Sequence, residues 1–309
     1  MAVLLAASLD PTAYECTVVS LFSEPNEELA GILDAAEIKL ICLGKELGFD
    51  ASMLLKLRSV ISDIGPQIVH SHLYILGYLI PSMLSLRGTK WVHTIHSMAG
   101  AEPLGRLGQI ANQLAFRTRV LPIGLTEAVG VSIRETYGIR EPLIIPNGIP
   151  THRFQREKDA SRRSAWRNME GLGEDDFLFV AVGRLSEEKK NDVDIRALDK
   201  LHADARLLVV GTGPRREELL KLAEDAGLAH RVHLMGLRDD IPRILGNSDC
   251  FVIPSKREGM PLSLMEAMAA ELPVIASATG GMIDMIEDKT NGCLTKPDDV
   301  DDLADAMRK

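Results

Sequence analysis

Short apolar segments of strand length alternate with longer segments of helical spacing along the whole chain. This alternation constrains the fold more than any other feature. The strand-like segments lie at 16–22, 38–44, 67–72, 90–96, 120–125 and 143–149, and again at 177–185, 205–213, 231–237, 250–255, 273–277 and 292–297. Strands that are apolar on both faces and alternate with helices form parallel sheets covered on both sides. Two such series predict an α/β protein with two Rossmann-like, doubly wound parallel-sheet domains.

A chain of 309 residues is long enough for two domains, since one domain takes about 100–200 residues. The polar stretch 150–174 breaks the strand rhythm and contains a basic run at 151–168. We therefore expect an N-terminal domain at 1–150 and a C-terminal domain at 151–309.

Composition argues against several classes of partner. The net charge of −9 leaves no global basic field for nucleic acid, and the aromatic residues are scattered. The apolar segment 73–86 is interrupted and shorter than the ~20 residues that span a bilayer. The four cysteines form no CxxC pair, and we interpret them as buried free thiols in a reducing cytosol. This interpretation predicts a cytoplasmic protein.

In open α/β sheets, ligands bind beyond the carboxyl ends of the strands. In the second half, glycines, cations and a carboxylate follow these strand ends, at 183–185, 211–214, 236–238, 255–261 and 279–281. This composition suits a phosphorylated ligand with a polyhydroxylated group. The glycines at 211 and 213 match a dinucleotide-binding fingerprint poorly, because Arg216 occupies the position of its third glycine.

Two cations follow the strand that ends at Gly183. Arg184 comes next, and Lys189 or Lys190 follows a few residues later. A helix is expected to begin near Asn191, with the Asn191 side chain as its cap. Two cations beside a helix N-terminus suit a diphosphate group. Surface cations without a ligand would produce the same pattern.

Two carboxylates, Glu258 and Glu266, flank a predicted helix start. Pro261 between them suits the first position of that helix. A carboxylate can accept hydrogen bonds from a vicinal diol, such as a ribose or another sugar offers. Gly259 and Met260 can offer backbone N–H groups to a phosphate. A solvated helix face is the alternative, which the Glu-Gly-Met-Pro turn argues against.

Two other patterns are interpreted without a metal ion. Asp192 and Asp194 form a DxD tripeptide at a predicted helix start, where helix capping and a solvated face explain it better than metal binding. His70 and His72 alternate along a strand and are expected on opposite faces, which argues against a two-histidine metal site. His96 lies near the end of the next predicted strand and is expected at the ligand-binding edge.

Together these segments resemble the retaining glycosyltransferases of family four, the glycosyl transferases of group 1, which have the GT-B fold. The resemblance covers essentially the whole chain and is more specific in the second half. It rests on 183–185 with Lys189, 211–214, 258–261 with 266–268, 273–276 with 280–281 and, more loosely, 68–72, 94–96 and 146–149. It implies two domains facing across a cleft, with the acceptor bound by residues 1–150 and the donor by residues 151–309.

The resemblance also implies roles for single residues. Arg184 and Lys189 would hold the donor diphosphate in place of a metal ion. Lys189 is chosen over Lys190 because many relatives have a glycine directly after the lysine. Glu258 would contact the donor sugar, and His96 would face the reaction centre across the cleft. The implied catalytic residues are His96, Glu258, Arg184 and Lys189, and the implied donor contacts are Gly183, Arg184, Lys189, Gly211, Leu237, Arg238, Glu258, Gly259, Met260, Pro261, Leu262 and, at the ribose, Glu266.

The implied activity is metal-independent transfer, with retention, of a hexosyl group from a UDP- or GDP-linked donor to a glycan or lipid-linked acceptor, as in polysaccharide biosynthesis. The resemblance implies no cofactor, and it leaves the oligomeric state and a peripheral contact with the inner face of the membrane open. The family's first strand with its glycine-rich loop and its terminal helices are missing from this sequence, which we therefore interpret as truncated at both ends. A non-catalytic nucleotide-sugar-binding fragment and a nucleotide-sugar epimerase stay as alternatives.

Overall fold

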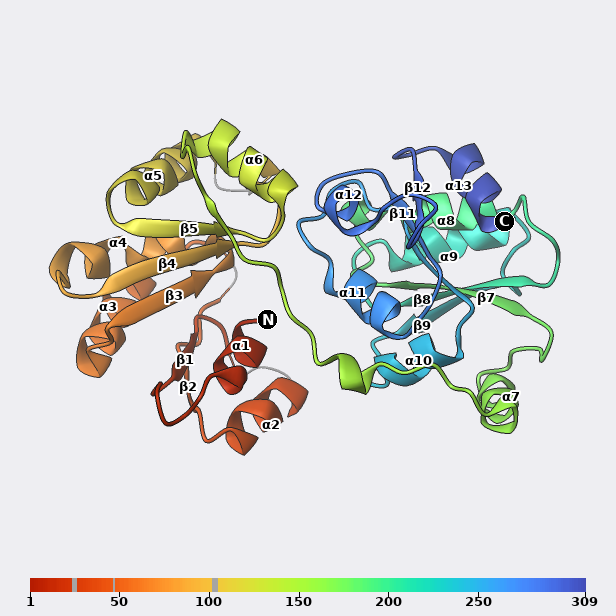
Figure 1. The fold of residues 1–309 in the computed structure, drawn as a ribbon, viewed down its shortest axis with the longest axis horizontal. Coiled ribbons are helices and arrows are strands. Elements are labelled where there is room, and N and C mark those ends of the chain that lie inside the picture. The colour runs from red at the N-terminus through yellow and green to blue at the C-terminus, as the bar shows by residue number, and fades with distance from the viewer. Residues whose placement is uncertain (24–26, 47, 102–104) are drawn as a thin grey trace. The chain divides into compact units, whose positions relative to one another are not determined.

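The structure is a computed structural model and describes residues 1–23, 27–46, 48–101 and 105–309. Its contacts divide the chain into two compact units. Unit 1 contains Met1–Leu125 and Val129–Gly148, and unit 2 contains Thr126–Ala128 and Ile149–Lys309. Both units combine parallel strands with helices (Figure 1), which confirms the predicted α/β class with two parallel-sheet domains. The break after Gly148 lies close to the predicted boundary at residue 150.

The strands along residues 1–148 form two ladders within the described residues, and all their pairs are parallel. In one ladder, β1 (Thr17–Ser20) pairs with β2 (Lys39–Cys42). The other has the order β3 (Ile68–His72), β4 (Lys90–Ile95), β5 (Val120–Gly124), β6 (Leu143–Ile144). The helices are α1 (Ala2–Ser8), α2 (Glu27–Ala35), α3 (Ser52–Ile64), α4 (Leu76–Ser85), α5 (Gly105–Thr118) and α6 (Glu127–Tyr137).

Unit 2 contains one parallel sheet of six strands among the described residues. Its order is β12 (Cys293–Thr295), β11 (Val274–Ser277), β10 (Cys250–Ile253), β7 (Phe177–Val182), β8 (Ala205–Val210), β9 (Val232–Gly236). The helices are α7 (Ala160–Met169), α8 (Asn191–Leu198), α9 (Arg216–Asp225), α10 (Ile241–Asn247), α11 (Leu262–Ala269), α12 (Met282–Met285) and α13 (Val300–Met307).

Helices cover both faces of the unit 2 sheet, as expected for strands that are apolar on both sides. Leu198, Leu219 and Leu303 place α8, α9 and α13 against one face. Trp166 and Leu264 place α7 and α11 against the other face, together with α10 and α12. Figure 1 shows these helices on the two sides of the sheet. The sheet is therefore doubly wound.

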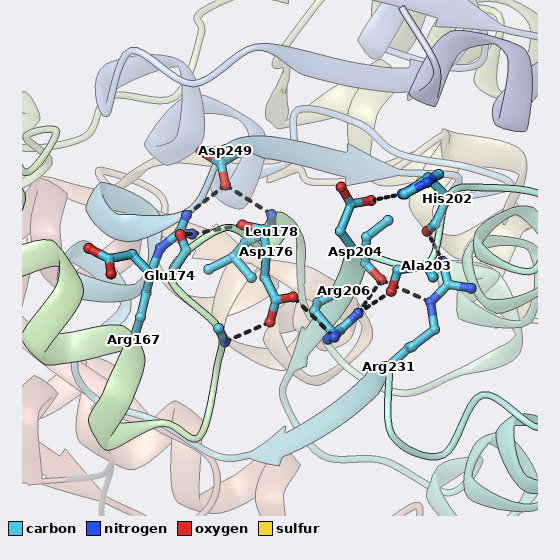
Figure 2. Close-up of polar contacts among 12 residues, drawn as sticks. Arg167, Glu174, Asp176, Leu178, His202, Ala203, Asp204, Arg206, Arg231 and Asp249 are labelled. Atoms are coloured by element: carbon cyan, nitrogen blue, oxygen red, sulfur yellow. Dashed lines mark hydrogen bonds and ion pairs between the residues drawn. The ribbon is translucent and has the colours of Figure 1, made fainter.

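The amino edge of this sheet, where its strands begin, is fixed by buried polar contacts (Figure 2). Asp249 lies just before β10 and accepts the Leu178 N–H at 2.9 Å. The same carboxylate accepts the Arg167 guanidinium at 2.8 Å and pairs with Arg163. Arg167 also donates to the carbonyl oxygen of Asp176 at 2.7 Å. These bonds connect α7 to the first residues of β7 and β10.

A second group of contacts continues along the same edge (Figure 2). Asp176, just before β7, accepts the Gly173 N–H at 2.7 Å and pairs with Arg206 at 3.0 Å. Arg231, just before β9, donates to the carbonyl oxygens of Ala205 at 3.0 Å and His202 at 2.7 Å. Buried charges are tolerated when they are paired in this way. The charged residues that precede the strands therefore help to define where the strands begin.

Two features differ from the sequence-based expectations. The basic run that was expected to mark a domain boundary contains α7, because Asp159 caps this helix and Trp166 is 1% exposed in the core. All four cysteines are free, but only Cys250 is buried. No helix in the described ranges has the length and apolarity needed to cross a membrane.

Candidate functional site

The strand order of unit 2 reverses between β7 and β10, which are hydrogen-bonded neighbours. The chain continues from β7 to β8 on one side and from β10 to β11 on the other. Open α/β sheets bind their ligands in the crevice at such a reversal. Gly183, Arg184 and Lys189 follow β7, and Glu258 follows β10. The structure thus brings four of the predicted site residues to the two strands that flank the reversal.

An ion pair connects the two loops at this reversal. The Nζ atom of Lys189 lies 2.7 Å from Oε1 of Glu258, and the two side chains are only 23% and 15% exposed. A Cβ atom at Gly183 would lie 3.0 Å from Cε of Lys189, so the lysine side chain extends over the end of β7. The Lys256 N–H also donates to the Glu188 carbonyl oxygen at 2.8 Å. The loops are therefore joined through both side chains and backbone.

The other two cations of the first loop have different surroundings. Arg184 is exposed, and within the described part of the chain its guanidinium makes no hydrogen bond or ion pair. Lys190 pairs with Asp298 at 2.6 Å and has a left-handed backbone with a φ of 54°. Glycine suits this backbone conformation better than lysine does. Lys189 and Lys190, which the sequence could not separate by position alone, thus bind different carboxylates.

Glycines allow the loops at this edge to pack backbone against backbone. A Cβ atom at Gly211 would lie 1.9 Å from the Gly183 carbonyl oxygen, and one at Gly281 would lie 1.6 Å from that of Gly259. No side chain fits at such distances, so both contacts need glycine. The Gly281 N–H donates to the Glu258 carbonyl oxygen at 2.9 Å. The loop that contains Glu258 is therefore fixed by the loop after β11.

Helix α11 begins one residue later than predicted. Pro261 is its N-cap residue, because a ψ of 123° keeps this proline extended, and Leu262 is the first helical residue. Met260 and Glu266 are half-buried and both contact other parts of the chain. The first amide groups of α11 follow the Glu258 loop directly, which suits an anionic ligand at this sheet edge.

The loop after β9, predicted to border a nucleobase, contains one exposed and one paired side chain. Leu237 is 80% exposed. Arg238 donates to Asp240 at 2.7 Å and to Glu170 at 2.8 Å, and these bonds raise its pKa further above the usual range. A hollow of about 290 Å³ adjoins the loop and is lined by Glu170, Leu208, His233, Leu234, Met235 and Arg238. A base contact in this loop would therefore come from the backbone or from Leu237.

The start of α8 differs from the prediction. Lys190 is the N-cap residue, and Asn191 makes no capping bond but donates to Asp194 at 3.2 Å. Asp192 pairs with Arg215 at 2.8 Å. Asp194 is fully buried, and burial raises its pKa well above the ordinary value. The prediction of a solvated face is wrong here, because the helix directs Asp194 into the protein.

His96 follows β4 at the carboxyl edge of the unit 1 sheet and lies in a cluster of histidines. Its Nε2 atom is 2.9 Å from Nδ1 of His72, the last residue of β3. His70 Nε2 lies 2.8 Å from Thr94 Oγ1, and the His70 and His72 ring centroids are 4.3 Å apart. The prediction that His70 and His72 lie on opposite faces is wrong, because residues two apart in a strand share a face.

His93 lies on the other face of the same strands, where its Nδ1 is 2.8 Å from Ser71 Oγ. Burial lowers the pKa of His72 and His93 to about 3 and that of His96 to about 4. These imidazoles are therefore neutral at pH 7. Among the residues that the structure describes, no group of three or more His, Cys, Asp or Glu side chains could hold a metal ion.

Sequence reasoning missed two contributions to these edges. His72 was not a predicted site residue, although its spacing from His70 at a strand end could have indicated two histidines on one face. Gly280 and Gly281 were recognised as a motif but not as part of the site. A Cβ atom at Gly280 would lie 2.1 Å from the Glu258 carbonyl oxygen. The glycine pair after a predicted strand was the signal for this close approach.

Two family models match the chain. Residues 162–309 match the family described as "Glycosyl transferases group 1", and residues 1–153 match "Glycosyltransferase Family 4". The two matched segments together cover nearly the whole chain.

The chain is also similar to curated proteins and to a solved structure. It is 28% identical over 309 aligned residues, 94% of this chain and 79% of the relative, to the UDP-Gal:alpha-D-GlcNAc-diphosphoundecaprenol alpha-1,3-galactosyltransferase of Escherichia coli. It is 31% identical over 216 residues, 66% of this chain but only 54% of the relative, to the GDP-mannose-dependent alpha-(1-6)-phosphatidylinositol monomannoside mannosyltransferase of Mycolicibacterium smegmatis. The crystal structure of Anabaena HepE in complex with UDP and glucose superposes with a TM-score of 0.84 and 22% identity, covering 98% of this chain and 84% of that one. This last similarity establishes the fold.

Proposed function

The chain belongs to the family-four glycosyltransferases, which have the GT-B fold, and we propose that it transfers a hexosyl group from a nucleoside diphosphate sugar to an acceptor hydroxyl. The observation that best supports this activity is the ion pair of Lys189 and Glu258 at 2.7 Å, at the strand reversal of unit 2. A cation for a phosphate and a carboxylate for sugar hydroxyls lie side by side there.

The proposed chemistry breaks the bond between the anomeric carbon of the sugar and the diphosphate oxygen. Negative charge develops on the departing diphosphate, and Lys189, Arg184 and the first amides of α11 would stabilise it. Arg184 suits this role because it has no partner within the described residues. The positive charge of these side chains takes the place of a divalent metal ion in the proposal.

The carboxylates would orient the donor. Glu258 would accept hydrogen bonds from the sugar hydroxyls, and Glu266 from the ribose diol. The acceptor hydroxyl would attack the face from which the diphosphate leaves, so that the anomeric configuration is retained, and the proton of that hydroxyl would pass to the departing diphosphate oxygen. His96 of unit 1, whose ring is neutral at pH 7, would contribute a hydrogen bond at the reacting sugar.

The names of the two relatives suggest the class of substrate. One name specifies UDP-Gal and a diphosphoundecaprenol-linked acceptor, and the other specifies GDP-mannose and a phosphatidylinositol mannoside. By analogy, we propose that the donor of the present chain is a UDP- or GDP-linked hexose. Its acceptor would be a glycan or a lipid-linked molecule, and the N-terminal half would bind that acceptor. A cytoplasmic reaction at the inner face of the membrane, in polysaccharide biosynthesis, fits such an acceptor.

The test is nucleotide-sugar turnover, preceded by a thermal-stability screen. A ligand that binds only the folded state raises its apparent stability, so a panel of UDP- and GDP-sugars identifies the donor. With that donor, we expect Lys189→Ala and Glu258→Ala each to lower the rate of transfer or hydrolysis by about 10²–10³-fold.

Lys190→Gly is the matched control, because it removes the neighbouring charge and suits the left-handed backbone at that position. Its turnover should equal that of the wild type. Undiminished turnover in the Lys189 and Glu258 variants would refute the assignment. Donor binding without turnover in the wild type would instead favour a nucleotide-sugar-binding protein, and interconversion of the donor without an acceptor would favour an epimerase.

A further inference from the structure

The carboxyl ends of β3 and β4 place four polar side chains on one face of the unit 1 sheet. His72 is paired in register with Thr94, and His70 and His96 lie two residues from these positions. The four groups form two hydrogen-bonded pairs, His70 with Thr94 at 2.8 Å and His72 with His96 at 2.9 Å. The His72 ring also lies between the others, 4.3 Å from His70 and 5.2 Å from His96 by ring centroids.

The atoms in the second pair decide what His96 can offer to a ligand. The bond joins Nδ1 of His72 to Nε2 of His96. An imidazole has only two nitrogens, so Nδ1 is the nitrogen of His96 that stays available. Both rings are neutral near pH 7, so one nitrogen of the bond donates and the other accepts. The proton position on His96 is therefore coupled to that on His72.

We propose that His72 is a positioning residue that holds the ring of His96 and fixes its tautomer, so that His96 presents its Nδ1 atom to the reacting sugar or acceptor. The proposal rests on the proposed glycosyl transfer for the identity of the ligand. Its geometric part rests on unit 1 alone. His70 helps to hold the His72 ring in place, because the His70 ring is hydrogen-bonded to Thr94 and packs on His72.

Two substitutions of His72 separate this role from simple packing. His72→Phe keeps a flat ring but removes the nitrogen that bonds to His96. His72→Asn loses the ring but keeps a polar atom near the position of Nδ1. His230→Asn, at an exposed histidine of unit 2, controls for the loss of a histidine as such.

The first readout is the tautomer of His96, from ring-nitrogen NMR of the full chain labelled with ¹⁵N-histidine. We expect one fixed tautomer in the wild type and in His230→Asn. In His72→Phe we expect a mixture that responds to buffer, and in His72→Asn a return toward one form. An unchanged His96 spectrum in His72→Phe would overturn the proposal. This measurement needs no substrate, so it decides the geometric part even if the proposed activity fails.

The second readout is turnover with the donor found in the stability screen. A misoriented group can lower a rate by about 10²-fold, so we expect kcat to fall about 10- to 100-fold in His72→Phe with donor KM nearly unchanged. His72→Asn should recover part of this loss, which a packing defect would not allow. A rise in KM alone, or equal defects in both variants, would contradict the positioning role.

Discussion

Charged side chains are paired more completely at the amino edge of the unit 2 sheet than at its carboxyl edge. At the amino edge, Asp249 accepts the Arg167 guanidinium and the Leu178 N–H (Figure 2). It also pairs with Arg163. At the carboxyl edge, Lys189 pairs with the single carboxylate of Glu258, and Arg184 has no side-chain partner within the described residues. Both edges belong to the same parallel strands, so the difference lies in the residues placed before and after each strand.

Under the proposed function, this difference separates groups that stabilise the fold from groups that would bind the donor. A charge that is already fully paired gains little from a bound phosphate, whereas an unpaired cation gains a partner. Sites of this kind are commonly retained at some expense of stability. We therefore expect substitutions at the amino edge to change the free energy of unfolding, and those at the carboxyl edge to change turnover.

The largest effect is expected for Arg184→Gln. Because this guanidinium stabilises nothing within the described chain, the free energy of unfolding should change by no more than about 0.5 kcal/mol. Turnover should fall by about 10²–10³-fold, as for other groups that stabilise a developing anion. Thermal denaturation and steady-state kinetics on the same preparation measure both quantities. A destabilised variant with normal turnover per folded molecule would reverse the comparison of the two edges.

A smaller effect, on the free energy of unfolding and not on turnover, is expected for Asp249→Ala. Removing this carboxylate leaves Arg163 and Arg167 without their common partner, and breaking a buried pair in this way lowers the free energy of unfolding by about 3 kcal/mol. Turnover per folded molecule should not change. Urea denaturation measures the loss, and Asp305→Ala, at an exposed ion pair with Arg308, is the control that should remain near the wild type. Equal stability of both variants would show that the amino edge is not a stabilising network.

The smallest effect is expected for Asp194→Asn, because Asp194 is a buried carboxyl group with an uncharged partner, Asn191. Its folded-state pKa is raised above the unfolded value of 3.8, so its contribution to stability is present below pH 3.8 and is lost as the pH rises through the folded pKa. The amide cannot ionise and avoids this loss. We expect the variant to become more stable than the wild type as the pH rises.

Denaturation of both proteins at intervals between pH 5 and pH 9 checks this expectation. The difference in the free energy of unfolding should grow with pH. A difference that is constant over the range would mean that Asp194 does not change its protonation state on folding.

The strands were predictable because buried parallel strands are apolar on both faces, and all twelve predicted segments contain a strand. Their ends were less predictable. The segment 143–149 yields only the two-residue strand Leu143–Ile144, and 177–185 ends as a strand at Val182. In both cases the apolar sequence pattern continues past the end of the strand into a loop. Whether those loop residues are buried depends on tertiary contacts, which the sequence pattern does not reveal.

The meeting of Gly183, Arg184, Lys189 and Glu258 at one edge was predictable, because residues that follow neighbouring parallel strands lie at the same edge of the sheet. The partners were not. Nothing in the sequence pairs Lys189 with Glu258, or Lys190 with Asp298, since these contacts join segments far apart in the chain. The burial of Asp194 depends likewise on how α8 packs. The common face of His70 and His72, in contrast, could have been predicted from the sequence, because residues two apart in a strand lie on the same face. The prediction placed them on opposite faces and was wrong.

The backbone bonds among the loops of the carboxyl edge also bear on the kinetics expected for binding of the proposed donor. Leu185 donates to Thr212 at 2.9 Å, Lys256 to Glu188 at 2.8 Å and Gly281 to Glu258 at 2.9 Å. Fixing the backbone of one residue costs about 1–2 kcal/mol of free energy through lost conformational entropy. In these loops that cost is already met when the protein folds, before any ligand binds. Donor association should therefore be a single fast phase whose rate depends on ionic strength through Arg184 and Lys189, with no slower step of loop ordering after the encounter.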